Sequence, residues 1–141
     1  MNKQTGSPES VVGAERQILV ADDDPAIVDA IKIVLEDEGY RVTTTVNGET
    51  VKKIRQDFPD LILLDIWMSG MDGRDITRYL KNQAATRHIP VIMISANRDT
   101  EQIALAAGAD GFLAKPFDIK DLIELVQKHL SSHDGGGHVT S

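Results

Sequence analysis

Residues 61–65 read Leu61-Ile62-Leu63-Leu64-Asp65, an all-apolar run that ends in a carboxylate. A short run that is apolar at every position is typical of a strand buried inside a parallel sheet. The stretch that follows, Ile66-Trp67-Met68-Ser69-Gly70, has the composition of a flexible loop. The sequence therefore predicts that Asp65 stands at the carboxyl end of a buried strand, where a loop begins.

Three further apolar runs also end in polar side chains. Residues 18–21 end in Asp22 and Asp23, residues 91–94 end in Ser95, and residues 112–114 end in Lys115 followed by Pro116. In an open parallel sheet the carboxyl ends of the strands share one edge, and ligands bind in the crevice at that edge. We therefore expect an acid cluster, a hydroxyl and an ammonium group to lie together there.

Composition limits the classes of protein to consider. A chain of 141 residues has the size of one domain. The net charge of −7 argues against direct contact with nucleic acid. The absence of cysteine excludes disulfides and fits a reducing compartment. The apolar runs fall short of the ~18 residues that cross a bilayer, and residues 1–15 lack a secretory signal. The expectation is a cytoplasmic protein without membrane contact.

Helix-like spacing of apolar residues follows each strand-like run. The residues that mark five helices are Ile27, Ala30, Ile31, Val34 and Leu35, then Val51 and Ile54, then Ile76, Tyr79 and Leu80, then Ile103, Ala106 and Ala107, and finally Ile119, Leu122, Ile123, Val126 and Leu130. With a second strand at residues 41–45, this alternation predicts a doubly wound five-stranded parallel sheet in a three-layer α/β/α fold. Residues 17–130 form the predicted domain, between a flexible extension at 1–16 and a disordered Gly-rich tail at 131–141.

The acidic run Asp22-Asp23-Asp24-Pro25 has both a structural and a chemical interpretation. Asp24 is a good helix N-cap and Pro25 a good first helical residue. Two more carboxylates ~5 Å apart would repel each other by about 3 kcal/mol at an effective dielectric constant near 20. An acidic loop alone is more often a solvated surface. With Asp65 across the crevice, a Mg²⁺ ion bound by carboxylates, waters and a phosphate is the better interpretation.

Ser95 and Lys115 are weak signals when each is taken alone. A hydroxyl at the end of a strand is commonly a turn former, and most lysines are solvated. Pro116 restrains the backbone next to Lys115, and the bond between them can be cis at a cost of about 0.5–1 kcal/mol. An ammonium fixed opposite an acid cluster is either a ligand of phosphoryl oxygens or part of an ion pair, and the context favours the first.

Together these motifs resemble the receiver domain of two-component response regulators. The motifs that carry the resemblance are Asp22-Asp23, Asp65, Ser95 and Lys115-Pro116-Phe117, in that order, and the loop Met68-Ser69-Gly70-Met71-Asp72-Gly73. The resemblance covers residues 17–130. Ser69 stands where the family usually has proline, which predicts a more mobile loop. The fold expected from the resemblance is the flavodoxin-like receiver fold.

The resemblance implies a phosphoacceptor site. Asp65 would be the nucleophile that takes a phosphoryl group from phosphohistidine of a sensor histidine kinase or a phosphotransfer protein. Asp23 and Asp65 would bind Mg²⁺ directly, together with the backbone carbonyl of Trp67, and Asp22 would hold one of the metal's waters. The protein would then be a signalling phosphoprotein and no enzyme beyond its own phosphorylation and dephosphorylation.

The resemblance also implies a switch. Lys115 would pair with the phosphoryl group, Ser95 would move to donate a hydrogen bond to it, and Phe112 would turn inward in response. The surface formed by the fourth helix, the fifth strand and the fifth helix would then change its affinity for a downstream protein effector. Trp67 and Asn97 are expected to flank the site and to tune phosphoryl loss; the alternative for Trp67 is passive surface packing. The chain is expected to be a monomer or a weak dimer.

Three alternatives remain open from the residues. A phosphatase of the haloacid-dehalogenase type would use Asp22 as nucleophile in an Asp-x-Asp pair, and would leave Asp65 without a role. A flavodoxin-like nucleotide carrier would need a phosphate-binding first loop, which three aspartates would repel. An interaction domain that is never phosphorylated would not need the complete set of acid, hydroxyl and lysine. No output domain is recognisable after residue 130, so the sequence leaves open a stand-alone receiver or a fragment of a longer regulator.

Overall fold

A computed structural model describes residues 15–68 and 70–136, and the following statements concern these residues. A five-stranded sheet forms the centre of the molecule, with strand order β3-β2-β4-β7-β8. Its strands are β2 (Gln17–Ala21), β3 (Arg41–Thr45), β4 (Leu61–Asp65), β7 (Val91–Ser95) and β8 (Gly111–Ala114). All four neighbouring pairs are parallel. The predicted doubly wound parallel sheet is confirmed.

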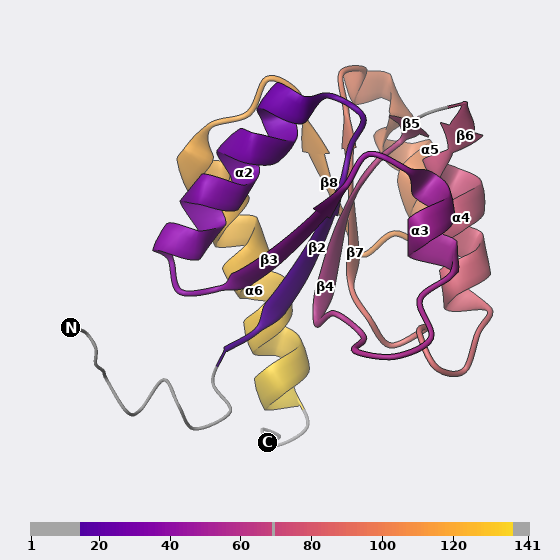
Figure 1. Ribbon diagram of the computed structural model, residues 1–141. Helices are drawn as coiled ribbons and strands as arrows, with labels where there is room; N and C mark the ends of the chain where they lie inside the picture. The colour runs from indigo at the N-terminus through magenta and orange to yellow at the C-terminus, as the bar shows by residue number, and fades with distance from the viewer. Residues whose placement is uncertain (1–14, 69, 137–141) are drawn as a thin grey trace.

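Helices cover both faces of the sheet (Figure 1). The helices are α2 (Pro25–Asp37), α3 (Gly48–Lys52), α4 (Gly73–Lys81), α5 (Glu101–Ala106) and α6 (Ile119–Gly136), with a single 3₁₀ turn, η1 (Arg98–Thr100), before α5. Helices α2 and α6 share a core with one face of the sheet, whereas α3, α4 and α5 share a core with the other. The three predicted layers are therefore present.

Two aliphatic cores result from the alternation of side chains along the strands. Ile18 and Val20 belong to the core beneath α2 and α6, and Leu19 and Ala21 belong to the core beneath α3 and α4. Successive side chains on a strand point to opposite faces, so an all-apolar strand feeds both cores at once. All five residues of β4 are buried. β4 is the middle strand of the sheet and supplies side chains to both cores. Each buried Leu or Ile contributes about 1.5–3 kcal/mol to the stability of the fold.

Local signals in the sequence explain where several helices begin and end. Asp24 is the N-cap of α2, and its side chain accepts a hydrogen bond from the backbone amide of Ala26 at 3.0 Å. Gly39 follows α2 with φ of +99°, a conformation that glycine adopts at little cost. Gly108 ends the α5 segment in the same way, with φ of +108°. These predicted helix boundaries are confirmed.

Helix α3 is shorter than predicted. We expected it to carry both Val51 and Ile54, but it ends at Lys52. The side chain of Arg55 donates hydrogen bonds to the carbonyls of Lys52 at 3.2 Å and Ile54 at 3.1 Å. A guanidinium that satisfies carbonyls at the end of a helix favours termination, because those carbonyls no longer need a further turn.

Helix α6 is longer than predicted. The fifth helix was expected to end at Leu130, before a disordered tail, but its backbone continues to Gly136. The disorder of the tail stays a prediction, and residues 137–141 lie outside the described part of the chain. Ser, His and Asp have helix propensities only modestly below that of alanine, so a long preceding helix can extend through residues 131–134, whereas glycine at 135 and 136 favours termination.

The segment after Asp65 contains more regular structure than the loop we expected. β5 (Trp67–Met68) and β6 (Met71–Asp72) pair as antiparallel strands, with Trp67 opposite Asp72 and Met68 opposite Met71. Ser69, whose presence predicted a mobile loop, lies outside the described residues. In the part of the chain that is described, no helix is both long and apolar enough to span a membrane.

Candidate functional site

Three carboxylates meet at the carboxyl edge of the sheet. Asp65 is the last residue of β4, and Asp22 follows β2 directly. Because β2 and β4 are neighbours, with Ala21 paired to Leu64, the two acids come from adjacent strands. One oxygen each of Asp22, Asp23 and Asp65 lies within 4.8 Å of the others. The predicted acid cluster is therefore present.

Asp22 is the most deeply placed of the three acids, with no exposed surface. Its Oδ1 accepts a hydrogen bond from the backbone amide of Asp24 at 3.0 Å. Its Oδ2 has no hydrogen-bond partner among the described residues. Lys115 Nζ is the counter-ion of that oxygen, at 2.9 Å. A buried carboxylate oxygen is costly without a positive partner, and Lys115 supplies that charge.

Lys115 comes to the site from the end of β8. Its backbone amide donates to the carbonyl of Ser95 at 2.8 Å, and its peptide bond to Pro116 is cis. Its Nζ lies 2.9 Å from Asp22 Oδ2 and 3.8 Å from Asp65 Oδ2. Burial lowers the pKa of this ammonium, but Asp22, Asp65 and Asp24 together outweigh burial, so the pKa is raised above its ordinary value. Lys115 is therefore a fixed positive charge against two of the three acids.

The surroundings of Asp65 disfavour the ionised form of its carboxyl group. Burial and, next, the charge of Asp22 raise the pKa of Asp65 from 3.8 to about 6. Lys115 and a hydrogen bond from the backbone amide of Trp67 oppose this rise without cancelling it. A divalent cation at the cluster would favour the ionised carboxylate, because an opposite charge within a few ångströms stabilises the charged form.

Ser95 is the last residue of β7, the strand that lies between β4 and β8 in the sheet. Asp65 is paired with Ile94 and Ser95 with Ala114, so Ser95 lies between the strands that carry Asp65 and Lys115. Its Oγ accepts a hydrogen bond from the backbone amide of Asn97 at 3.0 Å and lies 3.3 Å from the Asn97 carbonyl. Ser95 is therefore a turn former in this structure, and its hydroxyl would have to leave that turn to reach a ligand at Asp65.

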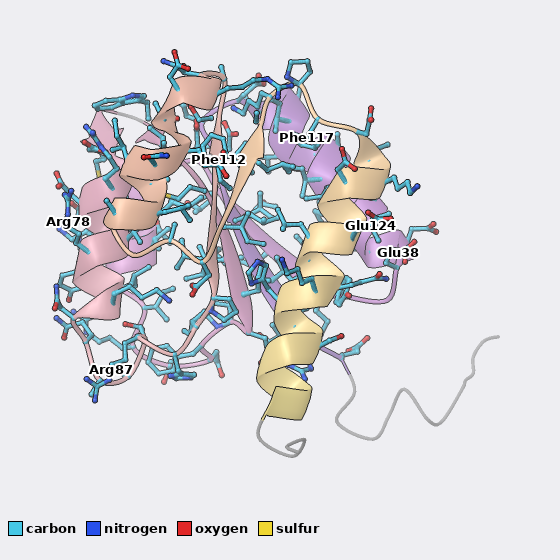
Figure 2. All side chains as sticks on the ribbon, turned by 180° about the vertical axis from the view of Figure 1, so that it is seen from behind. Glu38, Arg78, Arg87, Phe112, Phe117 and Glu124 are labelled. Carbon is cyan, nitrogen blue, oxygen red and sulfur yellow. The ribbon has the colours of Figure 1, made fainter. Side chains whose placement is uncertain are left out.

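Phe112 and Trp67 occupy different surroundings. Phe112 is half-buried on β8, opposite Met93, and packs against the core on the α5 side of the sheet (Figure 2). Trp67 is the first residue of β5 and its side chain is 60% exposed. Its indole lies against the guanidinium of Arg74, with 5.4 Å from the ring centroid to Cζ.

The donor set fits a hard divalent cation. Asp22, Asp23 and Asp65 supply carboxylate oxygens alone, and Asp23 is exposed and therefore accessible from solvent. Oxygen ligands from one to three carboxylates, completed by waters, suit Mg²⁺ better than softer metals. One ammonium, that of Lys115, faces the carboxylates of Asp22 and Asp65, and a divalent cation would neutralise the negative charge of the cluster that Lys115 leaves.

Gly73, Asp72 and Arg74 also shape the site, and the sequence did not reveal how. A Cβ on Gly73 would lie 2.5 Å from the backbone oxygen of Asp65, so only glycine fits there. Asp72 caps α4 and binds the side chain of Arg74. The Asp72-Gly73 pair at the start of a helix was a usable signal. No pattern in the sequence indicated the contact between Arg74 and Trp67, because that contact depends on the pairing of β5 with β6.

The fold and the site together define a class: α/β proteins with an acid cluster, a lysine and a hydroxyl at the carboxyl edge of a flavodoxin-like sheet. Residues 18–127 match the family model described as the response regulator receiver domain. This match covers well over half of the chain, and the chain belongs to the response regulator receiver family.

Named relatives agree with this assignment. The chain is 35% identical over 122 residues to the DNA-binding response regulator MtrA of Mycolicibacterium smegmatis, covering 84% of this chain and 52% of MtrA. It is 44% identical over 105 residues to the response regulator PleD of Caulobacter vibrioides, covering 72% of this chain and 23% of PleD. The chain thus spans about half the length of MtrA and less than a quarter of the length of PleD.

Solved structures show the same fold. A CheY-like response regulator receiver domain from Methanospirillum hungatei superposes with a TM-score of 0.78 at 31% identity, covering 86% of this chain and 98% of that one. The receiver domain of the sensor histidine kinase PA1611 from Pseudomonas aeruginosa superposes with a TM-score of 0.73 at 31% identity, covering 84% of this chain and 100% of that one. The latter structure has a magnesium ion coordinated in its active-site cleft.

Proposed function

We propose that this chain accepts a phosphoryl group on Asp65 from phosphohistidine of a sensor histidine kinase or a phosphotransfer protein. The observation that carries the proposal is the environment of Asp65. The pKa of its carboxyl group is raised by burial and by the neighbouring Asp22, so a bound cation would stabilise its ionised form, and its Oδ2 lies 3.8 Å from Lys115 Nζ. Membership of the receiver family supports the same reaction.

The residues of the site would divide the work as follows. Asp23, Asp65 and the backbone carbonyl of Trp67 would bind Mg²⁺, and Asp22 would hold one of its waters. When bound, Mg²⁺ supplies positive charge that neutralises the phosphoryl oxygens. A magnesium ion in the cleft of the PA1611 receiver supports this choice of metal.

In the proposed transfer, an ionised oxygen of Asp65 attacks the phosphorus atom of phosphohistidine. The new O–P bond forms as the N–P bond breaks, and the imidazole nitrogen leaves with the electron pair. Lys115 would pair with the phosphoryl group as its negative charge moves toward Asp65, and the hydroxyl of Ser95 would donate a hydrogen bond to it. Phosphoryl transfer depends mainly on such positioning and charge neutralisation.

Phosphorylation would shift the equilibrium between two states of the surface formed by α5, β8 and α6, with Phe112 as the aromatic group that changes position. A downstream protein effector would bind one state better than the other. MtrA is named as DNA-binding, but this chain matches about half of MtrA, so the output of any longer protein is a separate question. The net charge of −7 supports protein contacts and not nucleic acid for this domain.

The phosphatase alternative has no support from the family model or the relatives named above. It requires Asp22 as nucleophile, yet Asp22 is fully buried beneath Lys115 whereas Asp65 keeps some exposure. A phosphoryl donor reaches an exposed oxygen more readily than one without accessible surface.

The test is to expose the purified chain to acetyl phosphate and Mg²⁺ and then to reduce the acyl phosphate with borohydride. We expect the reduced residue to be Asp65, and we expect no uptake by Asp65→Asn or after chelation of the metal. Asp22→Asn is the matched control, because it removes an acid of the same cluster without removing the proposed nucleophile. Label on Asp22, or full uptake by Asp65→Asn, would overturn the proposal.

A further inference from the structure

Three side chains meet beside the β5–β6 hairpin: those of Trp67, Asp72 and Arg74. The guanidinium carbon of Arg74 lies 5.4 Å from the centroid of the Trp67 ring system. This distance is within the range of about 6 Å over which a cation on the face of an indole is attracted to it. The contact joins the first turn of α4 to the first residue of β5, Trp67, which follows Asp65 by two positions in the sequence.

Arg74 is itself held in place by Asp72. Its Nε donates to both carboxylate oxygens at 2.9 Å, and its Nη2 donates to Oδ2 at 2.5 Å. Asp72 Oδ1 also accepts the backbone amide of Arg74 at 2.8 Å, which caps α4. A planar guanidinium gripped through several charge-assisted hydrogen bonds loses most of its rotational freedom. Arg74 is therefore a fixed surface against which the indole rests.

The side chain of Trp67 has less support from the core than those of its neighbours. Ile66 and Met68 are each 1% exposed, whereas Trp67 is 60% exposed. Alternate residues of an extended segment point to opposite sides, so the two neighbours anchor the segment inward and the indole points outward. A ring with this much exposure has many accessible rotamers, so a stacked guanidinium contributes more to its orientation than it would to that of a buried ring.

The backbone of Trp67 touches the reactive centre. Its amide donates a hydrogen bond to the carboxylate of Asp65. Across the hairpin, Trp67 is paired with Asp72, the same residue that grips Arg74. Side-chain stacking, the hairpin pair and the amide hydrogen bond therefore converge on one peptide segment, whose carbonyl is one of the proposed metal ligands.

We propose that Arg74 is a positioning residue for the phosphoacceptor site: gripped by Asp72, it holds the Trp67 indole and thereby fixes the Trp67 backbone against Asp65. The inference rests on the proposed function, since it assigns a purpose to the geometry of the Trp67 carbonyl. A purely structural reading, in which Asp72 and Arg74 form only a cap and a surface ion pair, predicts no effect on Trp67 or on the metal.

Trp67 is the sole tryptophan of the chain, so its fluorescence reports on the stack directly. The variants are Arg74→Gln, which keeps a polar side chain but removes the charged guanidinium, and Arg74→Lys, which keeps a cation. Arg78→Gln is the matched control, because Arg78 is an exposed arginine of the same helix, paired with Asp75 at 3.0 Å (Figure 2). Thermal unfolding verifies that each variant is folded.

In metal-free protein we expect Arg74→Gln to red-shift the emission and to raise acrylamide quenching, and Arg78→Gln to leave both unchanged. By calorimetry we expect Arg74→Gln to weaken Mg²⁺ binding about two- to five-fold, the range that an exposed cation–π contact can supply. Arg74→Lys should restore only part of the affinity, because an ammonium keeps the charge beside the indole but cannot form the planar contacts with Asp72. A structural cap and ion pair alone would leave the quenching of Trp67 and the Mg²⁺ affinity unchanged in Arg74→Gln.

Asp72→Ser provides a second variant, because serine keeps a capping oxygen but cannot grip the guanidinium. It should show the same quenching and the same loss of Mg²⁺ affinity as Arg74→Gln. Wild-type quenching and wild-type affinity in these two folded variants would overturn the positioning role. Failure of the wild-type chain to take up phosphate would overturn the proposed function instead, and the metal-free quenching comparison would still decide whether Arg74 holds Trp67.

Discussion

Asp65 occupies an unfavourable environment as long as no cation is bound. Burial and the charge of Asp22 raise its pKa from 3.8 to about 6, so the folded protein holds the proton more tightly than the unfolded chain does. Between pH 4 and pH 6, therefore, Asp65 is mostly ionised in the unfolded chain but still mostly protonated in the folded protein. The contribution of Asp65 to stability falls as the pH rises through this window, and the loss is complete above it.

Replacing Asp65 with asparagine should consequently stabilise the metal-free protein at neutral pH. We expect a gain of roughly 2 kcal/mol at pH 7.5, which shrinks toward zero at pH 4. The measurement is urea unfolding of both proteins in a chelator at the two pH values. Saturating Mg²⁺ should reverse the order, because ligands that bind the folded state stabilise it and only the wild type keeps the full donor set. An asparagine variant that is less stable at pH 7.5 without metal would contradict this account.

Lys115 is the counter-ion that makes the burial of Asp22 tolerable. Lys115→Met should destabilise the metal-free protein by about 2 kcal/mol, less than for a fully buried pair because Lys115 keeps 18% of its side chain exposed. Adding Asp22→Asn to this variant should recover most of the loss, since the fully buried Asp22 carboxylate is then no longer left without its counter-ion. A double-mutant cycle by urea unfolding measures the coupling. Simple additivity of the two losses would show that the pair is not coupled.

At the scale of the element, the sequence predicted the strands well. The four apolar runs that end in Asp22, Asp65, Ser95 and Lys115 are strands that meet at one edge, because apolarity on both faces permits few other structures. Helix ends marked by a cap or a glycine were also predictable. Their chemistry is local, so it can be read from a few adjacent residues.

The elements that the sequence did not predict depend on contacts made only in the folded chain. Helix α3 ends early because Arg55 turns back onto the carbonyls of Lys52 and Ile54. The β5–β6 hairpin pairs residues on either side of a short turn, in a segment without alternating polarity. Arg74 reaches Asp72 at a spacing of two residues, which does not bring side chains together within a helix. Asp72 lies at the cap, outside the helix, which is why the contact forms.

The junction of β4 and α4 depends on the absence of a side chain at Gly73. A Cβ there would lie 2.5 Å from the Asp65 carbonyl oxygen and 3.0 Å from Ile66 Cα, so backbone would have to move. We expect Gly73→Ala to lower Mg²⁺ affinity and phosphate uptake at least ten-fold, on the order of 1.4 kcal/mol or more of lost binding free energy. Calorimetry and acetyl phosphate assays measure the two quantities.

Gly70→Ala is the control for Gly73. Its Cβ would meet nothing within 4 Å, although its φ of +75° makes alanine somewhat strained. We expect this variant to lose about 1 kcal/mol of stability and to keep its metal affinity. Equal metal affinity in the two alanine variants would mean that the close approach at Gly73 has no influence on the site.

At the scale of the molecule, strand order makes the site and the proposed output surface neighbours. Ser95 is paired with Ala114, Met93 with Phe112, and the Lys115 amide donates to the Ser95 carbonyl at 2.8 Å. The β3 edge, by contrast, is separated from β7 by both β2 and β4. A change at Ser95 therefore has a short path to β8 and a long one to β3.

This asymmetry predicts where the fold should respond to phosphorylation. Adding Mg²⁺ and beryllofluoride, a phosphoryl mimic, should alter hydrogen exchange in β7, α5 and β8 far more than in β3. In Ser95→Ala the mimic should still bind, because Asp65 and Lys115 remain, but the response at Phe112 should shrink, since the hydroxyl that would leave the Asn97 turn is gone. The comparison is hydrogen exchange of both proteins with and without the mimic. A response that is uniform across the sheet, or unchanged in Ser95→Ala, would mean that the two strands do not carry the signal.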